Sequence, residues 1–63
     1  MESYETLQIE LSSRGFIDTP ITEKSWCWLN DRGFNHCDIV EIAIDVACGY
    51  ELSEAIQSNR ESV

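Results

Sequence analysis

The chain has 63 residues, of which 12 are acidic and 4 are basic, so its formal net charge is −8. This negative charge argues against direct binding to nucleic acid or to anionic membranes, because both carry negative phosphates. The acidic N-terminus does not resemble a signal peptide and no apolar run reaches membrane-spanning length, so we expect one cytoplasmic domain over residues 1–63.

The first predicted helix covers about residues 3–14, with Ser3 as its N-cap. Three apolar residues at positions i, i+3 and i+7 form its core-facing stripe: Tyr4, Leu7 and Leu11. Ile9 lies about 160° from that stripe around the helix axis. It is therefore either an ordinary exposed apolar residue or part of a contact with a second chain.

The second predicted helix covers about residues 20–32, with Thr19 as N-cap and Pro20 at the first helical position. Five residues share its inner face: Ile21, Ser25, Trp28, Leu29 and Arg32. This face places Trp28 in the core, whereas Trp26 points well away from it. Trp26 is therefore a candidate interface residue, the alternative being that its ring lies flat on the flank of its own domain.

The third predicted helix covers about residues 36–48 and is capped by Asn35. Its polar residues fall in one narrow strip made of Asp38, Glu41 and Asp45, and most of the remaining surface is apolar. A helix of this kind needs neighbours on several sides, so we expect it to be the central element. The strip is a candidate protein interface, and the alternative is a solvated helix face.

The fourth predicted helix covers about residues 51–59, and we expect the chain to be frayed over about 58–63. The inward-facing residues of this helix are Leu52, Ala55 and Ile56. The three glycines, Gly15, Gly33 and Gly49, each precede an aromatic residue, which is typical of a helix end on which the aromatic packs back. No segment alternates with period two. The predicted fold is an all-α compact bundle of three to four short helices around a central apolar helix.

The residues with reactive side chains do not form a catalytic or metal-binding pattern. Cys27, Cys37 and Cys48 contain no C-x-x-C pair, and together with His36 their spacing does not match a zinc site, so we expect small buried thiols. The chain also lacks a phosphate-binding loop. We therefore expect no enzymatic activity, no cofactor and no metal.

The segment from Trp26 to Ile56 resembles the three-helix layout of ubiquitin-associated domains. The resemblance lies in a helix, the loop Arg32-Gly33-Phe34, a second helix, Gly49-Tyr50 and a third helix. In those domains the first loop carries Met-Gly-Phe, and here arginine replaces the methionine. The paired leucines of their last helix are also absent. The resemblance implies a three-helix fold for this segment.

Over its whole length the chain resembles the small orphan proteins that lambdoid phages encode in the early leftward operon, between exonuclease and excisionase. The features in common are a short, acidic, helical chain without catalytic residues. This resemblance implies early modulation of the host and of the choice between lysis and lysogeny, through binding of host or phage proteins.

Two functions follow as hypotheses. The first is a small acidic protein-interaction module, with self-association as a homodimer left open, whose candidate interface residues are Ile9, Trp26, Asp38, Glu41 and Asp45. The second is an acidic DNA mimic that inhibits a nucleic-acid-binding protein.

Overall fold

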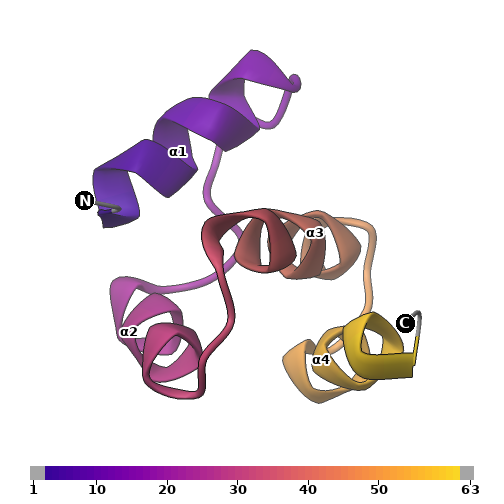
Figure 1. The fold of residues 1–63 in the computed structure, drawn as a ribbon. Coiled ribbons are helices and arrows are strands. Elements are labelled where there is room, and N and C mark those ends of the chain that lie inside the picture. Colours follow the sequence, from indigo (N-terminus) through magenta and orange to yellow (C-terminus); the bar gives the residue numbers. More distant parts are fainter. Residues whose placement is uncertain (1–2, 62–63) are drawn as a thin grey trace.

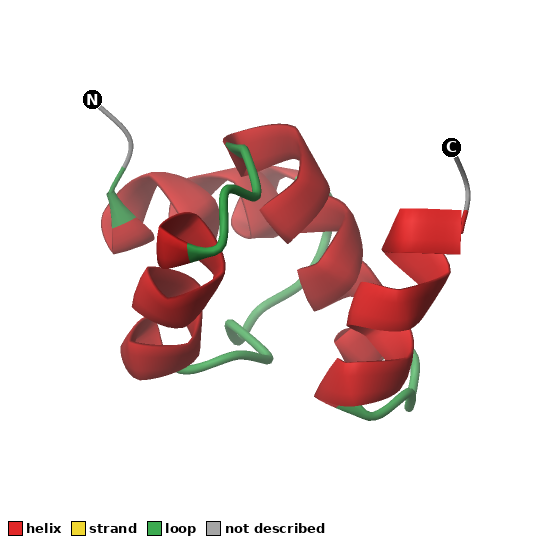
Figure 2. Cartoon of the chain, turned by 60° about the horizontal axis from the view of Figure 1, so that its bottom comes forward, coloured by secondary structure: helices red, strands yellow, loops and turns green. Residues whose placement is uncertain are grey.

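Helices make up most of the computed structural model, which describes residues 3–61. They are α1 (Tyr4–Ser13), α2 (Glu23–Asp31), α3 (His36–Ala47) and α4 (Leu52–Glu61). Helix α3 lies in the middle, with α1, α2 and α4 arranged around it (Figure 1). Residues 3–61 contain no strand (Figure 2). The predicted all-α bundle around a central helix is therefore confirmed.

The core is built on α3, which buries Ile39, Val40, Ile42 and Ala43 and packs against both α1 and α4. Leu7 and Leu11 of α1, Leu29 of α2 and Ala55 of α4 are each at most 1% exposed, and Ile21, at 5%, completes the core. Burial of a side chain of this size contributes about 1.5–3 kcal/mol relative to its exposed state. The radius of gyration of 10.6 Å matches the roughly 10.6 Å expected for a compact domain of this length.

Two of the predicted N-caps are present. The Ser3 hydroxyl accepts a hydrogen bond from the Thr6 amide at 3.3 Å, and the Asn35 side-chain oxygen accepts one from the Asp38 amide at 2.8 Å. Each cap satisfies a backbone donor that the first turn of a helix leaves without a partner. α1 and α3 therefore begin where the sequence predicts.

The predicted start of α2 is wrong by three residues. The helix begins at Glu23 and its N-cap is Thr22, whose hydroxyl accepts the Ser25 amide at 3.1 Å. Pro20 lies in the irregular segment before the helix. The reason is tertiary: Ile21 is 5% exposed in the core, and its carbonyl accepts the Tyr4 hydroxyl at 2.7 Å, contacts that hold this part of the chain outside the helix.

All three glycines have positive φ angles, of 90° to 112°, and end their helices as predicted. In α1, for example, the Gly15 amide donates to the Ser12 carbonyl and the Phe16 amide to the Leu11 carbonyl, both at 3.0 Å. This pair of bonds defines the Schellman motif. Phe16 and Phe34 pack against the core, but Tyr50 is 58% exposed and does not pack back as expected.

The last helix is longer than predicted. α4 continues to Glu61, whereas the sequence indicates an end near residue 59 and fraying from about residue 58. Its first turn carries Leu52 and Ala55 toward the core, as predicted, together with Ile56. Residues 62–63 of the expected frayed end lie outside the described residues.

Candidate functional site

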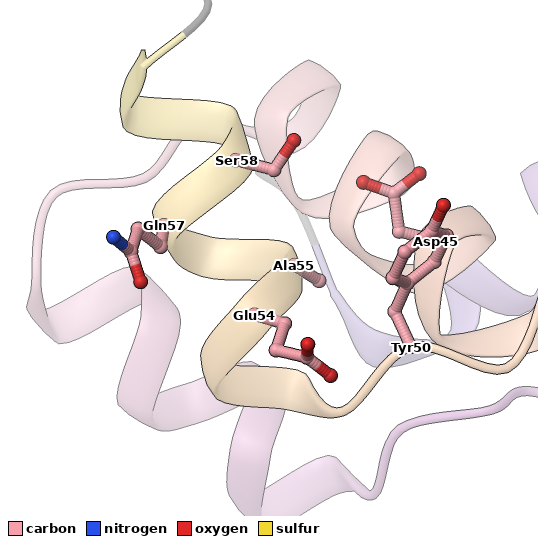
Figure 3. A pocket seen from close by; sticks show the side chains of 6 residues that line it. All are labelled: Asp45, Tyr50, Glu54, Ala55, Gln57 and Ser58. Atoms are coloured by element: carbon pink, nitrogen blue, oxygen red, sulfur yellow. The ribbon is translucent and has the colours of Figure 1, made fainter.

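Helices α3 and α4 border an open hollow of about 340 Å³ at the molecular surface. It is lined by Asp45, Tyr50, Glu54, Ala55, Gln57 and Ser58. Figure 3 shows the carboxylates of Asp45 and Glu54 and the phenol ring of Tyr50 projecting toward the gap between the helices. The Ser58 hydroxyl points the same way, whereas the Gln57 amide lies on the other side of α4. We call this arrangement the α3–α4 hollow.

The local sequence explains why these side chains meet. The turn at Gly49, with φ of 112°, reverses the chain and leaves Tyr50 at its edge. The Glu54 carboxylate accepts a hydrogen bond from the Glu51 amide at 3.2 Å, which caps the start of α4 and restrains the Glu54 side chain. Ala55, at 1% exposure, is small enough for α4 to lie close to α3.

The predicted polar strip of α3 faces this side of the molecule only in part. Asp45 lines the α3–α4 hollow, while Glu41 and Asp45 both line a neighbouring hollow of about 290 Å³ that reaches Arg14 and Asn59. The Asn59 side chain donates to the Glu41 carboxylate at 3.4 Å and so links α4 to α3. Asp38, half-buried in the first turn of α3, lines neither hollow.

The other predicted interface residues lie elsewhere. Ile9 is 68% exposed on α1 and lines neither of these two hollows. The helical periodicity of the sequence indicates neither the exposure of Tyr50 nor a site role for Glu54. The available signals were the Gly49-Tyr50 pair after α3 and a glutamate three residues beyond Glu51, in the spacing of a capping box.

The predicted placement of Trp28 in the core is wrong, and for Trp26 the structure supports the alternative that its ring packs on its own domain. Trp26 is half-buried against the core, where its ring meets the Tyr4 ring edge-on with centroids 6.3 Å apart. Trp28 is 43% exposed, with the Arg32 guanidinium 4.3 Å from its ring centroid. The exposed aromatic of α2 is therefore Trp28, and Trp26 has the flank-packing position that was its alternative.

The three cysteines are also placed differently from the prediction. Cys27, Cys37 and Cys48 are all exposed free thiols, because each lies on the outer side of its helix or at its end. Within residues 3–61, no group of three or more His, Cys, Asp or Glu side chains is arranged to hold a metal ion. In the same range, no helix has the length and apolar character that crossing a membrane requires.

No protein-family model matches the chain, and no match was found among curated proteins or among solved structures. The geometry of the α3–α4 hollow therefore carries the functional proposal. Two carboxylates and an aromatic ring around one opening provide charge attraction and a π face for a cationic group.

Proposed function

We propose that this chain is a non-enzymatic protein-interaction module whose α3–α4 hollow receives a lysine or arginine side chain of a partner protein. One observation carries the proposal: Asp45, Tyr50 and Glu54, from two helices and the turn between them, line the same opening. Its volume of about 340 Å³ lies near the lower end of the roughly 300–1,000 Å³ range of ligand pockets.

The charge of the hollow is available to a partner. Asp45 and Glu54 form no ion pair with the basic side chains of residues 3–61, and the Arg14–Glu10 pair, at 3.0 Å, does not involve them. The net charge of −8 adds a long-range field that speeds the approach of a basic protein at low salt. A guanidinium group in the hollow can contact a carboxylate and stack on the Tyr50 ring.

The resemblance to early proteins of lambdoid phages supports a more specific form of this proposal. In that form the partner is a host or phage protein, the place of action is the host cytoplasm, and the effect bears on the choice between lysis and lysogeny. In a pull-down with the tagged chain, we expect to recover a basic host protein. Substitutions in the α3–α4 hollow should abolish this recovery.

The test uses the purified chain and a fluorescently labelled arginine-rich peptide. We expect Asp45→Asn combined with Glu54→Gln to weaken binding about tenfold, because two charge-assisted contacts are lost. Glutamine at position 54 still offers an oxygen to the Glu51 amide, so the cap remains. Glu5→Gln with Asp18→Asn, two exposed sites elsewhere, is the matched control.

The result that contradicts the proposal is equal weakening in both double variants, which would assign the effect to net charge alone. Sedimentation of the free chain belongs to the same experiment, because it shows whether self-association as a homodimer occupies the hollow. If the chain dimerises and the Asp45 and Glu54 variants dimerise equally well, the hollow is not the dimer contact.

A DNA-mimic function is the second candidate, favoured by Glu41, Asp45 and Glu54 lying on one side of the molecule with few cations nearby. A mimic that fills a DNA-binding groove depends on many charges at once. Its affinity for a DNA-binding protein falls steeply between low and physiological salt, whereas a contact anchored by one side chain in a hollow changes less. The salt dependence of binding therefore distinguishes the two functions.

A further inference from the structure

Helix α2 carries a second surface, different in character from the α3–α4 hollow. Lys24, Trp28 and Arg32 follow one another at i, i+4 and i+8, so their side chains lie along one side of the helix and its C-cap. The sequence alone indicates dispersed basic residues, but two of the four meet here around an exposed tryptophan. We call these three residues the α2 ridge.

The ridge borders an open apolar hollow. Lys24, Ser25 and Trp28 of α2 and Leu52 of α4 line a space of about 220 Å³. The ring of Trp28, the side chain of Leu52 and the methylene stem of Lys24 provide most of its wall. The Arg32 guanidinium lies over the Trp28 ring at 4.3 Å and restrains it. An apolar side chain is the group that such a space fits.

The two cations beside this hollow are not neutralised by contact. Neither Lys24 nor Arg32 forms an ion pair with a carboxylate of the described residues, although Glu23 is next to Lys24 and Asp31 next to Arg32 in sequence. They are two of only four basic residues in a chain that has 12 acidic ones, so they form a small positive site on a mostly acidic surface. The partner that complements them carries carboxylates next to an apolar residue.

We propose that the α2 ridge and the hollow beside it form a docking site for an acidic peptide segment of another protein. One bulky apolar side chain of that segment fills the space between Trp28 and Leu52, and flanking carboxylates pair with Lys24 and Arg32. This site is independent of the α3–α4 hollow and selects the opposite charge.

A peptide fits this surface better than a nucleic acid does. Single-stranded nucleic acid also combines negative charge with groups that stack on tryptophan. However, it follows a basic groove over several nucleotides, and the remaining surface here is strongly acidic and repels a long polyanion. A short segment with one apolar anchor needs only the local pair of cations, because salt screens charges beyond about 8–10 Å.

The test is an NMR titration of the isotope-labelled chain with a pooled mixture of synthetic peptides. Each peptide has two central positions drawn from Leu, Ile, Val, Met, Phe and Trp, with two Asp or Glu residues on each side. We expect the indole N–H signal of Trp28 and the amide of Leu52 to shift and those of Trp26 and Ile9 to stay unchanged. A pool with serine at the central positions should bind at least about tenfold more weakly.

Matched variants separate the site from bulk charge. Lys24→Glu with Arg32→Glu should abolish the Trp28 shift, whereas Arg14→Glu with Arg60→Glu has the same net charge and should retain most of it. Trp28→Ala should lose binding while Ile9→Ala, at another exposed apolar residue, should not. Circular dichroism of each variant confirms that the helices are intact, and the variants are compared only if it does.

Three outcomes overturn the proposal: no shift at Trp28 with the acidic pool at millimolar concentration, equal losses in both charge-reversal variants, or a shift with oligothymidylate but not with the peptides. The last result would assign the ridge to nucleic acid. A pool with Lys in place of Asp and Glu reports on the α3–α4 hollow instead, so the proposed function can fail or hold without affecting this result.

Discussion

The hydroxyl group of Tyr4 donates a hydrogen bond of 2.7 Å to the main-chain carbonyl of Ile21, which joins the first turn of α1 to the segment before α2. The bond connects residues 17 apart in sequence, and it is part-buried. Next to it the Tyr4 ring meets Trp26 edge-on. Tyr4 therefore attaches the first turn of α1 both to the segment before α2 and to α2 itself.

Removing this hydroxyl should destabilise the domain. Tyr4→Phe keeps the ring against Trp26 but leaves the Ile21 carbonyl without its donor, at an expected cost of about 1 kcal/mol in the free energy of unfolding. For a domain this small that corresponds to a fall in Tm of about 4–8 °C. Tyr50→Phe is the control, because Tyr50 is exposed and should change Tm little. Equal Tm values for both variants and the parent would show that the Tyr4 bond does not contribute.

The two tryptophans should respond in opposite ways to truncation. Trp26→Ala removes a ring packed on Tyr4 and the core and should lower the free energy of unfolding by about 2–3 kcal/mol. Trp28→Ala removes an exposed ring and should cost less than about 1 kcal/mol. Urea unfolding followed by circular dichroism measures both. A larger loss for Trp28→Ala would contradict the placement described above.

The helix end at Gly33 should tolerate asparagine better than alanine. Gly33 has a φ angle of 90°, and no atom lies within 4 Å of the position that a Cβ would take. The cost of substitution is therefore conformational rather than steric. Gly33→Ala should lower the free energy of unfolding by about 1–2 kcal/mol and Gly33→Asn by less, because asparagine adopts positive φ more readily. Thermal unfolding of the two variants in parallel makes the comparison.

All three thiols should be reactive in the native chain. Cys27, Cys37 and Cys48 are exposed, so Ellman's reagent should titrate three thiols per chain without denaturant. Single Cys→Ser variants assign each to its residue. A thiol that reacts only after denaturation would be covered in solution, and sedimentation would then show whether a second copy covers it.

Local signals in the sequence were sufficient to predict most of the helices. The Asn35 cap, the apolar run of α3 and the glycine stops act through neighbouring backbone groups, so their effects do not depend on the rest of the fold. The Thr19-Pro20 signal is equally local, but the burial of Ile21 and its bond to Tyr4 outweigh it. Local patterns therefore failed where a long-range contact competes with them.

The wrong placement of Trp28 follows from the same cause. The predicted inner face of the second helix used Ile21 as its first member, and Ile21 lies outside α2. Without Ile21, the orientation of α2 follows from the burial of Leu29 and from the contact with the Tyr4 ring. Trp26 precedes Leu29 by three residues, so the two side chains lie on the same side of the helix and Trp26 faces inward. The position of α1 beside α2 is part of the tertiary structure, and it cannot be predicted from the pattern of residues 20–32.

The candidate site was only partly accessible to prediction. Asp45 and Glu41 were identified from the polar strip of α3, because helical periodicity places them on one side. Tyr50 and Glu54 join Asp45 only after the Gly49 turn folds α4 back beside α3. The α2 ridge likewise needs Leu52 from another helix.

The glycine turns have a kinetic consequence. In residues 3–61, every backbone–backbone hydrogen bond outside the helices spans five residues or fewer. The backbone groups at the helix ends are therefore bonded within the same helix or its adjoining turn, and not to the backbone of another helix. Chains whose contacts are mostly near neighbours collapse to their native state within microseconds to milliseconds. A newly synthesised copy of this chain should thus be ready to act almost as soon as it leaves the ribosome.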